Sequence, residues 1–406
     1  MSPRILYVSF DVVPAPKGAA THIEQFTKAL SAKYGSLNLV TVADSDLAGC
    51  RPASFCPEIE HTTLPALGDN LISRVLHFRR LLNCWVAGKF FDVLHFRSPF
   101  EGLWLAAQKA NVCRRLVYEV NGLPSIELKY RYPRVAEDNV LMDKLIAQEQ
   151  FCMDLADSII TPSAVTKEFL IQRGVAGEKI AVIPNGVSLE VFTFSSPKLI
   201  EPDKSIELLY FGTLAAWQGV QQAIKAHALV ARDAASRLTI VGSARDNQLD
   251  EFRELIHDMG LDDTVRILPP VSQLELLELM HQSNIILAPL TANDRNCLQG
   301  CSPLKVFEGM ASGTPVITSD LPVVTELPGV NKIDGQTDCL LLAKAGSAKT
   351  IKDRIFELKD SPLRAIDVAS NARRLIENYY TWERAGSQLV DVYDDVLSNR
   401  EKIFSR

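Results

Sequence analysis

The sequence predicts an α/β fold with two doubly wound parallel sheets, and three observations support this. Apolar, strand-like runs alternate with helical stretches along most of the chain, which is typical of parallel sheets. The alternation breaks at residues 193–205, which hold two prolines and little apolar periodicity, and then restarts. The length of 406 residues is also large for a single core.

The elements of the first half follow from these periodicities. We expect strands at 4–10, 37–43, 91–96, 115–120, 158–163 and 179–187. We expect helices at 19–35, 101–112, 137–156 and 164–173.

The second half repeats the pattern. Its predicted strands are 206–214, 237–243, 265–271, 284–290, 315–320 and 339–343. Its predicted helices lie near 218–232, 247–259, 272–282 and 304–311, with further helices to the end. Each half is thus an α/β unit of similar size.

Composition narrows the class of protein. The net charge of −6 argues against nucleic acid as the main partner. The eight cysteines form no CxxC pair, and together with the absence of an opening signal peptide this predicts a cytoplasmic protein with reduced thiols. Asp44 and Asp46 invite a magnesium interpretation, but no other ligands converge there, so no metal site is expected.

Ligands of open α/β sheets bind where strands end and helices begin. After the first strand, Lys17–Gly18–Ala19–Ala20 lets the backbone approach a phosphate or sugar. A tight strand–helix turn is the alternative. The motif is not GxGxxG, which disfavours a nicotinamide site.

Polar residues also follow two later strands of the first half. Arg97 and Ser98 come directly after one strand, and Glu119, Asn121 and Glu127 follow the next. Carboxylate and amide groups at these positions can hold sugar hydroxyls. Ordinary helix capping is the alternative.

The most informative stretch is residues 296–320. Its small-residue loop leads into a helix at Leu304 that carries two charges on one face, Lys305 and Glu308. Backbone N–H groups and Lys305 suit an anion such as phosphate, and Glu308 suits the hydroxyls of a ribose. A surface Lys–Glu pair is the alternative, but it leaves the small-residue loop unexplained.

Several motifs together resemble the family-four retaining glycosyltransferases of the GT-B fold. They are "KGAATHIEQFTKALS", "IPNGV", "YFGTLAAWQGV" and "FEGMASGTPVI", in order and over nearly the whole chain. The "PLKVFE" form resembles a branch of bacterial exopolysaccharide-assembly enzymes. The resemblance implies two Rossmann-like domains facing a cleft, at 1–192 and 206–375, joined by a linker at 193–205. It also implies that the terminal helices (376–406) return to the first domain and that no metal is required.

The resemblance also assigns residues, with departures. Glu308 matches the second glutamate of the family's Glu–x7–Glu motif, but Gly300 stands where the first is expected. Thr213 and Gln218 stand near the places of the family's phosphate-binding Arg and Lys, so Lys305 and Arg295 are the candidates to replace those cations.

The expected site residues fall into three groups. Donor-binding residues are Gly18, Ala19, Gly212, Thr213, Gln218, Arg295, Gly300, Cys301, Ser302, Pro303, Leu304, Lys305 and Glu308. Acceptor-side residues are His22, Arg97, Ser98, Asn121 and Glu127. The residues assigned to catalysis are Lys305, Glu119 and Asn121.

The implied reaction is transfer of a hexose from a nucleotide sugar, with UDP-glucose the first choice, to a glycan or lipid-linked acceptor without a cofactor. The alternatives are a nucleotide-sugar-binding protein with little catalysis and a GT-B nucleotide-sugar epimerase or phosphorylase. Basic and aromatic residues at 74–91 and 128–134 suggest peripheral contact with the cytoplasmic face of the membrane, or else an ordinary solvated basic face.

Overall fold

The structure, a computed structural model, describes residues 2–15, 17–43, 57–243, 246–328, 330 and 338–398. The chain forms two compact units. The N-terminal unit comprises Met1–Pro184 and Trp382–Arg406, and the C-terminal unit comprises Asn185–Thr381. Both contain a parallel sheet, which confirms the predicted fold class. Asp44 and Asp46 lie outside the described residues.

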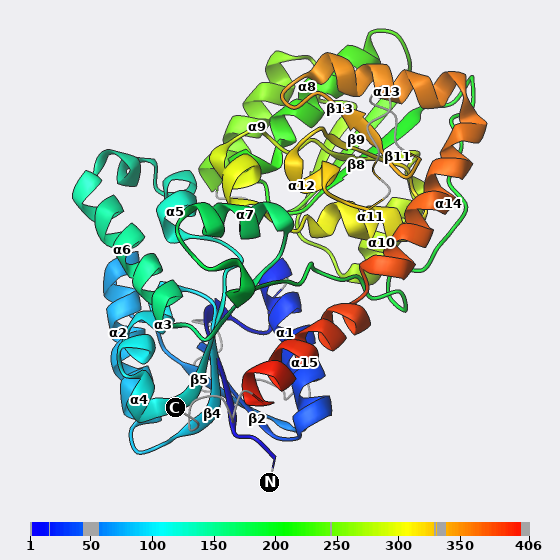
Figure 1. Ribbon diagram of the computed structural model, residues 1–406. Coiled ribbons are helices and arrows are strands. Elements are labelled where there is room, and N and C mark those ends of the chain that lie inside the picture. Colours follow the sequence, from blue (N-terminus) through cyan, green and yellow to red (C-terminus); the bar gives the residue numbers. More distant parts are fainter. Residues whose placement is uncertain are drawn as a thin grey trace. The chain divides into compact units, whose positions relative to one another are not determined.

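The N-terminal unit is built on a seven-stranded sheet with strand order β3-β2-β1-β4-β5-β6-β7. Figure 1 shows the neighbouring strands β4 and β5 of this sheet side by side. All of its strand pairs are parallel. The strands are β1 Ile5–Val12, β2 Leu37–Val42, β3 Ile59–Leu64, β4 Phe91–Phe96, β5 Cys113–Glu119, β6 Ser158–Thr161 and β7 Ile180–Val182. The central strand β1 begins with four fully buried residues, because helices cover both faces of a parallel sheet.

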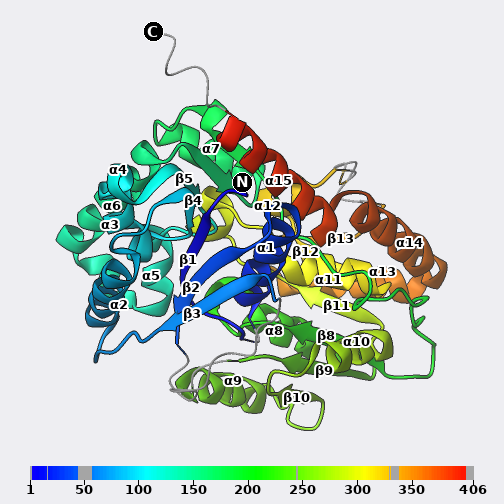
Figure 2. The ribbon, with the colours of Figure 1, turned by 90° about the horizontal axis from the view of Figure 1, so that it is seen from below.

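The helices of this unit connect successive strands. They are α1 Gly18–Tyr34, α2 Leu71–Val86, α3 Pro99–Ala107, α4 Lys109–Val112, α5 Pro124–Arg131, α6 Asn139–Leu155 and α7 Ala164–Gln172, together with α15 Trp382–Ser398. Helix α15 lies alongside α1, as Figure 2 shows. Helix α15 therefore brings residues from the end of the chain next to the first helix, as predicted for a terminal helix.

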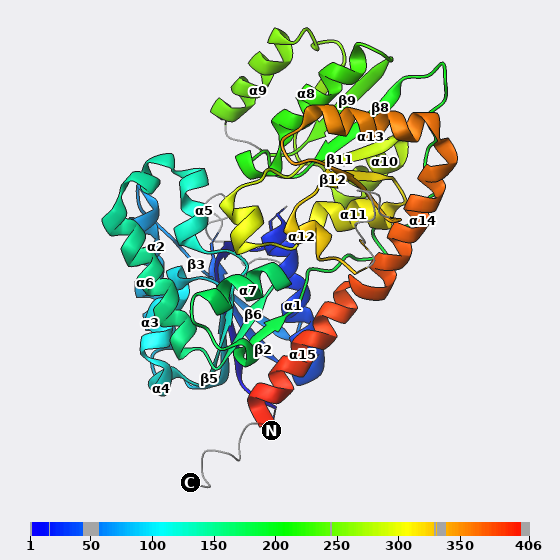
Figure 3. The ribbon, with the colours of Figure 1, turned by 45° about the horizontal axis from the view of Figure 1, so that its top comes forward.

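The C-terminal unit has a six-stranded parallel sheet with strand order β10-β9-β8-β11-β12-β13. Its strands are β8 Ile206–Phe211, β9 Ser236–Val241, β10 Val265–Leu268, β11 Ile285–Ala288, β12 Val316–Ser319 and β13 Leu341–Ala343. Its helices are α8 Val220–Ala231, α9 Asp246–Asp258, α10 Gln273–Gln282, α11 Leu304–Ser312, α12 Pro322–Thr325, α13 Ala348–Asp360 and α14 Pro362–Tyr379. Helix α14 packs against α11 (Figure 3).

Residues 193–205, where the sequence predicts a linker, are tied to the C-terminal unit. The Ser195 N–H donates to the Ser312 carbonyl at 3.0 Å, and the Asn284 amide donates to the Lys198 carbonyl at 2.9 Å. The two compact units divide at Pro184/Asn185 and at Thr381/Trp382. These contacts are invisible to local composition, because they join segments far apart in the sequence.

Two further observations concern the described part of the chain. No helix there is both long and apolar enough to cross a bilayer. The six cysteines described are free thiols.

Candidate active site

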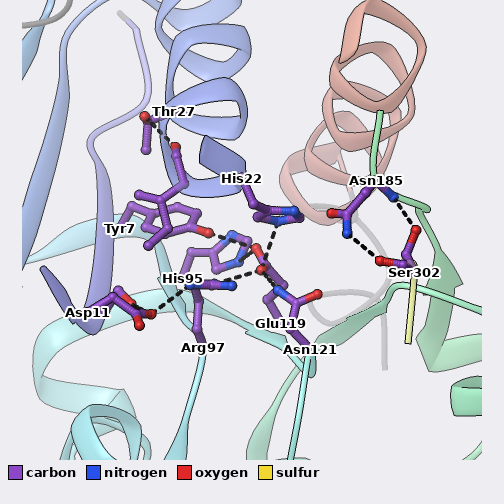
Figure 4. A network of polar contacts seen from close by, with 12 residues as sticks. Tyr7, Asp11, His22, Thr27, His95, Arg97, Glu119, Asn121, Asn185 and Ser302 are labelled. Atoms are coloured by element: carbon purple, nitrogen blue, oxygen red, sulfur yellow. Dashed lines mark hydrogen bonds and ion pairs between the residues drawn. The ribbon is translucent and has the colours of Figure 1, made fainter. Parts of the chain in front are cut away.

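In the N-terminal unit, the carboxylate of Glu119 is the centre of a buried polar network at the end of β5 (Figure 4). The Glu119 side chain is only 1% exposed. Its Oε2 accepts a hydrogen bond from the Tyr7 hydroxyl at 2.7 Å and lies 3.0 Å from His95 Nε2. These two partners come from the central strands β1 and β4, so they fix this oxygen to the core of the sheet.

The other oxygen, Oε1, gathers three residues that the sequence assigns to the acceptor side. It accepts from Arg97 Nε at 2.8 Å and from the side-chain amide of Asn121, and it lies 2.9 Å from His22 Nε2. Arg97 directly follows β4, Asn121 follows β5 and His22 lies on α1, so the three side chains meet at the carboxyl edge of the sheet. We call this network the Glu119 cluster: Tyr7, His22, His95, Arg97, Glu119 and Asn121.

The charges of the cluster keep Glu119 ionised. Burial by itself would raise the pKa of Glu119, but His22 and Arg97, together with the hydrogen bonds, hold it well below its usual range. Arg97 also pairs with Asp11 at 2.8 Å. Burial opposes the charge of Arg97, yet the nearby Glu119 carboxylate raises its pKa above the usual value. A carboxylate that is ionised at neutral pH and almost fully buried is suited to holding its neighbours and poorly suited to exchanging protons with a substrate.

Ser98 has a local role in the structure. It is the N-cap of α3, where its hydroxyl accepts from the Phe100 N–H at 3.1 Å. Glu101 completes the capping box by accepting from the Ser98 N–H at 2.7 Å and from the Arg97 N–H at 2.9 Å. The turn that carries Arg97 is thereby fixed, and the capping alternative describes Ser98.

The other predicted residues of this unit lie on the surface or beside the cluster. Gly18 and Ala19 open α1, and no side chain caps this end of the helix. Glu127 lies in the first turn of α5, with its carboxylate against Gly122.

In the C-terminal unit, Lys305 reaches from α11 to the end of β8. Its side chain is 8% exposed, and its Nζ donates to the Tyr210 hydroxyl at 3.2 Å and lies 4.2 Å from the centre of the Tyr210 ring. A Cβ atom at Gly212 would stand 3.2 Å from Lys305 Cε. Because glycine has no side chain, Gly212 provides the space that the end of the Lys305 side chain occupies.

Lys305 and Glu308 influence each other. Burial lowers the pKa of Lys305 to about 7, while the charge of Glu308 raises it. Burial raises the pKa of Glu308 to about 8, while Lys305 lowers it. Both pKa values lie near neutral pH, so a ligand that favours the charged form of either group can change its protonation there.

Asn296 anchors the loop before α11, and sequence reasoning missed it. It is fully buried in the π-helix Arg295–Gln299. Its amide nitrogen donates to the carbonyls of Trp217 at 3.0 Å and Thr291 at 2.9 Å. Its Oδ1 accepts from Arg295 Nη1 at 3.1 Å. The loop after β11 is thereby fastened to the loop after β8. A buried amide in a loop carries no sequence signature of its own.

The small residues between Asn296 and α11 are held by neighbouring groups. The Cys301 thiol is buried and lies 3.9 Å from Asn296 Oδ1. The hydroxyl of Ser302 accepts from the Asn185 N–H at 2.9 Å, and its carbonyl accepts from the Asn185 amide at 3.0 Å (Figure 4). Pro303 precedes Leu304 at the start of α11, and no side chain caps that end.

The remaining predicted residues lie in the loop after β8 or against it. Thr213 is exposed, and the Tyr210 hydroxyl contacts the carbonyls of Thr213 and Gln218 at 3.4 and 3.3 Å. Arg295 stacks over the Trp217 ring at 5.2 Å. The structure thus brings Lys305, Gly212, Thr213 and Gln218 together around Tyr210. Among the residues described, no cluster of three or more His, Cys, Asp or Glu could hold a metal ion.

Two family models match consecutive parts of this chain. "Glycosyltransferase Family 4" matches residues 16–191, and "Glycosyl transferases group 1" matches residues 191–381. A D-inositol 3-phosphate glycosyltransferase of Pseudarthrobacter chlorophenolicus is 25% identical over 400 residues, covering 92% of this chain and 86% of that protein.

Solved structures share the fold. A sucrose-phosphate synthase from Thermosynechococcus elongatus superposes with a TM-score of 0.78 at 19% identity, covering 98% of this chain and all of that one (100%). The Anabaena protein HepE in complex with UDP-glucose superposes with a TM-score of 0.70 at 16% identity, covering 97% of this chain and 100% of that one. At these identities the likeness establishes the fold alone.

Proposed function

The chain belongs to the group 1, family 4 glycosyltransferases, which are retaining enzymes that use nucleotide-sugar donors, and we propose that it transfers a hexose from a UDP-sugar, with UDP-glucose the first choice. The acceptor we propose is a glycan or lipid-linked sugar in polysaccharide assembly, as in the "PLKxFE" branch. The UDP-glucose complex of the Anabaena protein with the same fold supports this choice of donor.

One observation carries the donor assignment. The Lys305 ammonium lies at the end of β8, against Gly212 and Tyr210, in the loop region where the expected phosphate-binding cations are replaced by Thr213 and Gln218. Lys305 therefore supplies from α11 the positive charge that this loop lacks. The uncapped start of α11 adds backbone N–H groups that favour an anion.

The chemistry follows from the charge that develops on the leaving group. As the bond from the anomeric carbon to the diphosphate oxygen breaks, negative charge accumulates on the diphosphate. Protonated Lys305 and the N–H groups of α11 stabilise that charge. Glu308, one turn further along α11, accepts hydrogen bonds from the ribose hydroxyls. Attack on the same face as departure retains the anomeric configuration, and the leaving oxygen takes the proton of the acceptor.

In the N-terminal unit we assign Arg97, Asn121 and His22 to the acceptor side, held by Glu119. The hydrogen-bonding groups of Arg97 and Asn121 suit sugar hydroxyls. Glu119 itself acts as a positioning residue, because its carboxylate is buried and occupied by its neighbours.

A donor screen with Lys305 variants tests the proposal. UDP-glucose and other nucleotide sugars are offered, and released UDP is measured with the anomeric configuration of any product. Lys305→Met should lower kcat by about 100-fold, as loss of one oxyanion-stabilising group does. The control is Lys167→Met, which removes a lysine that donates to the Ile180 carbonyl in the other unit. This variant should leave kcat unchanged. Equal activity of the two variants would refute the role of Lys305.

Gly300, in place of the expected glutamate, favours one rival function, a nucleotide-sugar-binding protein with little catalysis. Tight UDP-glucose binding with no UDP release in the presence of acceptors would establish that rival. Isomerised nucleotide sugar in the absence of acceptor, or sugar phosphate in the presence of phosphate, would instead indicate an epimerase or a phosphorylase.

We also propose peripheral contact with the cytoplasmic face of the membrane through α2. Ile72 and Leu76 on this helix are 59% and 56% exposed, and Arg80 is exposed as well. Arg79 is not part of this surface, because its guanidinium donates to the Pro99 and Phe100 carbonyls. Apolar and basic groups together favour an anionic bilayer.

Vesicle binding tests this contact. The wild-type protein should sediment with vesicles of anionic lipid at low salt and not with vesicles of zwitterionic lipid. An Ile72→Ser, Leu76→Ser double variant should lose most of this binding, whereas Leu274→Ser, at a site on α10 that is 67% exposed, should keep it. Wild-type protein that ignores anionic vesicles would refute the contact.

A further inference from the structure

Tyr393, on the last helix of the N-terminal unit, makes a buried hydrogen bond into the Glu119 cluster. Its hydroxyl lies 2.8 Å from His95 Nδ1, although the two residues are 298 positions apart in the sequence. Both side chains are fully buried. We propose that Tyr393 is a positioning residue that orients His95 and, through it, the Glu119 carboxylate that holds the acceptor-side residues. This inference rests on the acceptor-side assignment of the proposed function.

The protons of this chain of contacts can be assigned. Glu119 is ionised, so its oxygens only accept hydrogen bonds. His95 Nε2, 3.0 Å from Glu119 Oε2, must therefore carry a hydrogen and donate it. Burial lowers the pKa of His95, which leaves the imidazole neutral and Nδ1 without a hydrogen. The Tyr393 hydroxyl consequently donates to Nδ1, and every hydrogen bond in the series points toward Glu119.

The rings add orientation to the hydrogen bonds. The Tyr7 ring stacks on His95 with centroids 4.3 Å apart, and the Tyr393 ring lies 6.0 Å from His95 at an angle of 28°. Tyr7 thus packs on a face of the imidazole and bonds Glu119 through its hydroxyl, while Tyr393 lies at the Nδ1 edge of the ring and bonds His95 itself. A ring fixed in this way leaves one direction for its Nε2–H, which is toward Glu119 Oε2.

The consequence lies at the other carboxylate oxygen. Because Oε2 is fixed by His95 and Tyr7, Oε1 has a defined position from which it holds Arg97, Asn121 and His22. A tilt of the carboxylate moves all three together. Small displacements of binding groups are costly for a reaction that depends on alignment. Helix α15 therefore contributes to the geometry of a site whose side chains all come from other elements.

The chain offers a matched control for Tyr393. Tyr34 on α1 donates its hydroxyl to Asp394 of α15 at 2.8 Å, and its ring lies 6.0 Å from that of Tyr393. Removal of the Tyr34 hydroxyl loosens the same pair of helices without touching His95. Comparison of Tyr393→Phe with Tyr34→Phe therefore separates the positioning role from helix packing.

Two measurements test the inference. In the first, nitrogen-15 NMR of the full-length protein follows the ring nitrogens of His95 and the Nε–H of Arg97. Tyr393→Phe should shift His95 Nδ1 toward the value of a nitrogen without a donor, and should shift the Arg97 Nε–H signal, while Tyr34→Phe leaves both unchanged. In the second, UDP-glucose turnover is measured with octyl glucoside as the acceptor probe. Tyr393→Phe should raise the acceptor KM by about tenfold without changing UDP affinity.

The outcomes separate this inference from the proposed function. Unchanged His95 and Arg97 signals in Tyr393→Phe would overturn the positioning role, as would an equal rise of acceptor KM in Tyr34→Phe. A wild-type protein that releases no UDP from any donor would refute the proposed function. In that case the NMR comparison still decides whether Tyr393 orients the Glu119 cluster.

Discussion

Binding of the donor should move protons at Lys305 and Glu308, and the direction should reverse with pH. A bound diphosphate keeps Lys305 charged, so the complex takes up a proton wherever the free protein holds a neutral lysine. A bound ribose keeps Glu308 ionised, so the complex releases a proton wherever the free protein holds a neutral carboxyl. The pKa of Lys305 is lowered to about 7 and that of Glu308 is raised to about 8.

The magnitude follows from these two values. The two contributions cancel where the neutral fractions are equal, at about pH 7.5. At about pH 8.5 nearly all of Lys305 and about a quarter of Glu308 are neutral, which gives a net uptake of about 0.7 proton. At about pH 6.5 the proportions are reversed, which gives a net release of about 0.7 proton.

Titration calorimetry with UDP-glucose in buffers of different ionisation enthalpy measures this transfer directly. UDP-glucose is preferable to UDP, because the terminal phosphate of UDP titrates itself near about pH 6. In Glu308→Gln only the uptake should remain, shifted to lower pH because the carboxylate no longer raises the pKa of Lys305. In Lys305→Met only the release should remain. Net proton transfer in Lys305→Met that equals the wild-type value at every pH would refute the contact between Lys305 and the diphosphate.

Three further predictions concern the framework of the two sites. Gly219→Ala should lower the free energy of unfolding in urea by about 3 kcal/mol, because φ is +75° and a Cβ would stand 1.7 Å from the Pro289 carbonyl oxygen. Gly260→Ala, at φ +67° with open space around it, should lower it by only about 1 kcal/mol. Asn296→Ala should cost about 1–3 kcal/mol and weaken UDP-glucose binding, because the buried amide loses its hydrogen bonds to two carbonyls; an unchanged affinity would count against its proposed role in the donor loop. The stability that ionised Glu119 contributes is present above its unfolded pKa of 4.5 and is lost as pH falls toward its lowered folded value, so acid should destabilise the wild-type protein more than Glu119→Gln.

The sequence predicts most of the fold because most of its strands are apolar runs that alternate with helical stretches. The patterns of β1 and β4 indicate strands clearly, since burial on both faces demands continuous apolar residues. β3, Ile59–Leu64, was missed. It lies at the edge of its sheet, and its "IEHTTL" is mostly half-buried. An edge strand needs less apolar surface, so its sequence resembles a loop.

The sequence predicts candidate site residues where their spacing along one helix is enough to bring them together. Lys305 and Glu308 share a helix, and their spacing alone places them on one face. His95, Tyr393 and Asn296 had no such signal. A histidine in a strand looks like a core residue, and its partner Tyr393 lies 298 positions away on a helix whose own pattern only shows an apolar face. Contacts of this kind depend on the tertiary fold.

The backbone at Gly300 explains why this donor loop differs from the expected motif. Gly300 adopts φ 82° and ψ 167°, a conformation that essentially only glycine tolerates. A glutamate at this position would have to change the path of the loop. The chain therefore differs from the expected motif in its backbone conformation as well as in the absence of a carboxylate. Asn296 holds the turn on one side, through the Trp217 and Thr291 carbonyls, and Asn185 holds it on the other, through Ser302. Because hydrogen bonds fix the loop at both ends, we expect backbone groups between Asn296 and Leu304 to meet the donor sugar, and the path of the chain there to set the sugar preference.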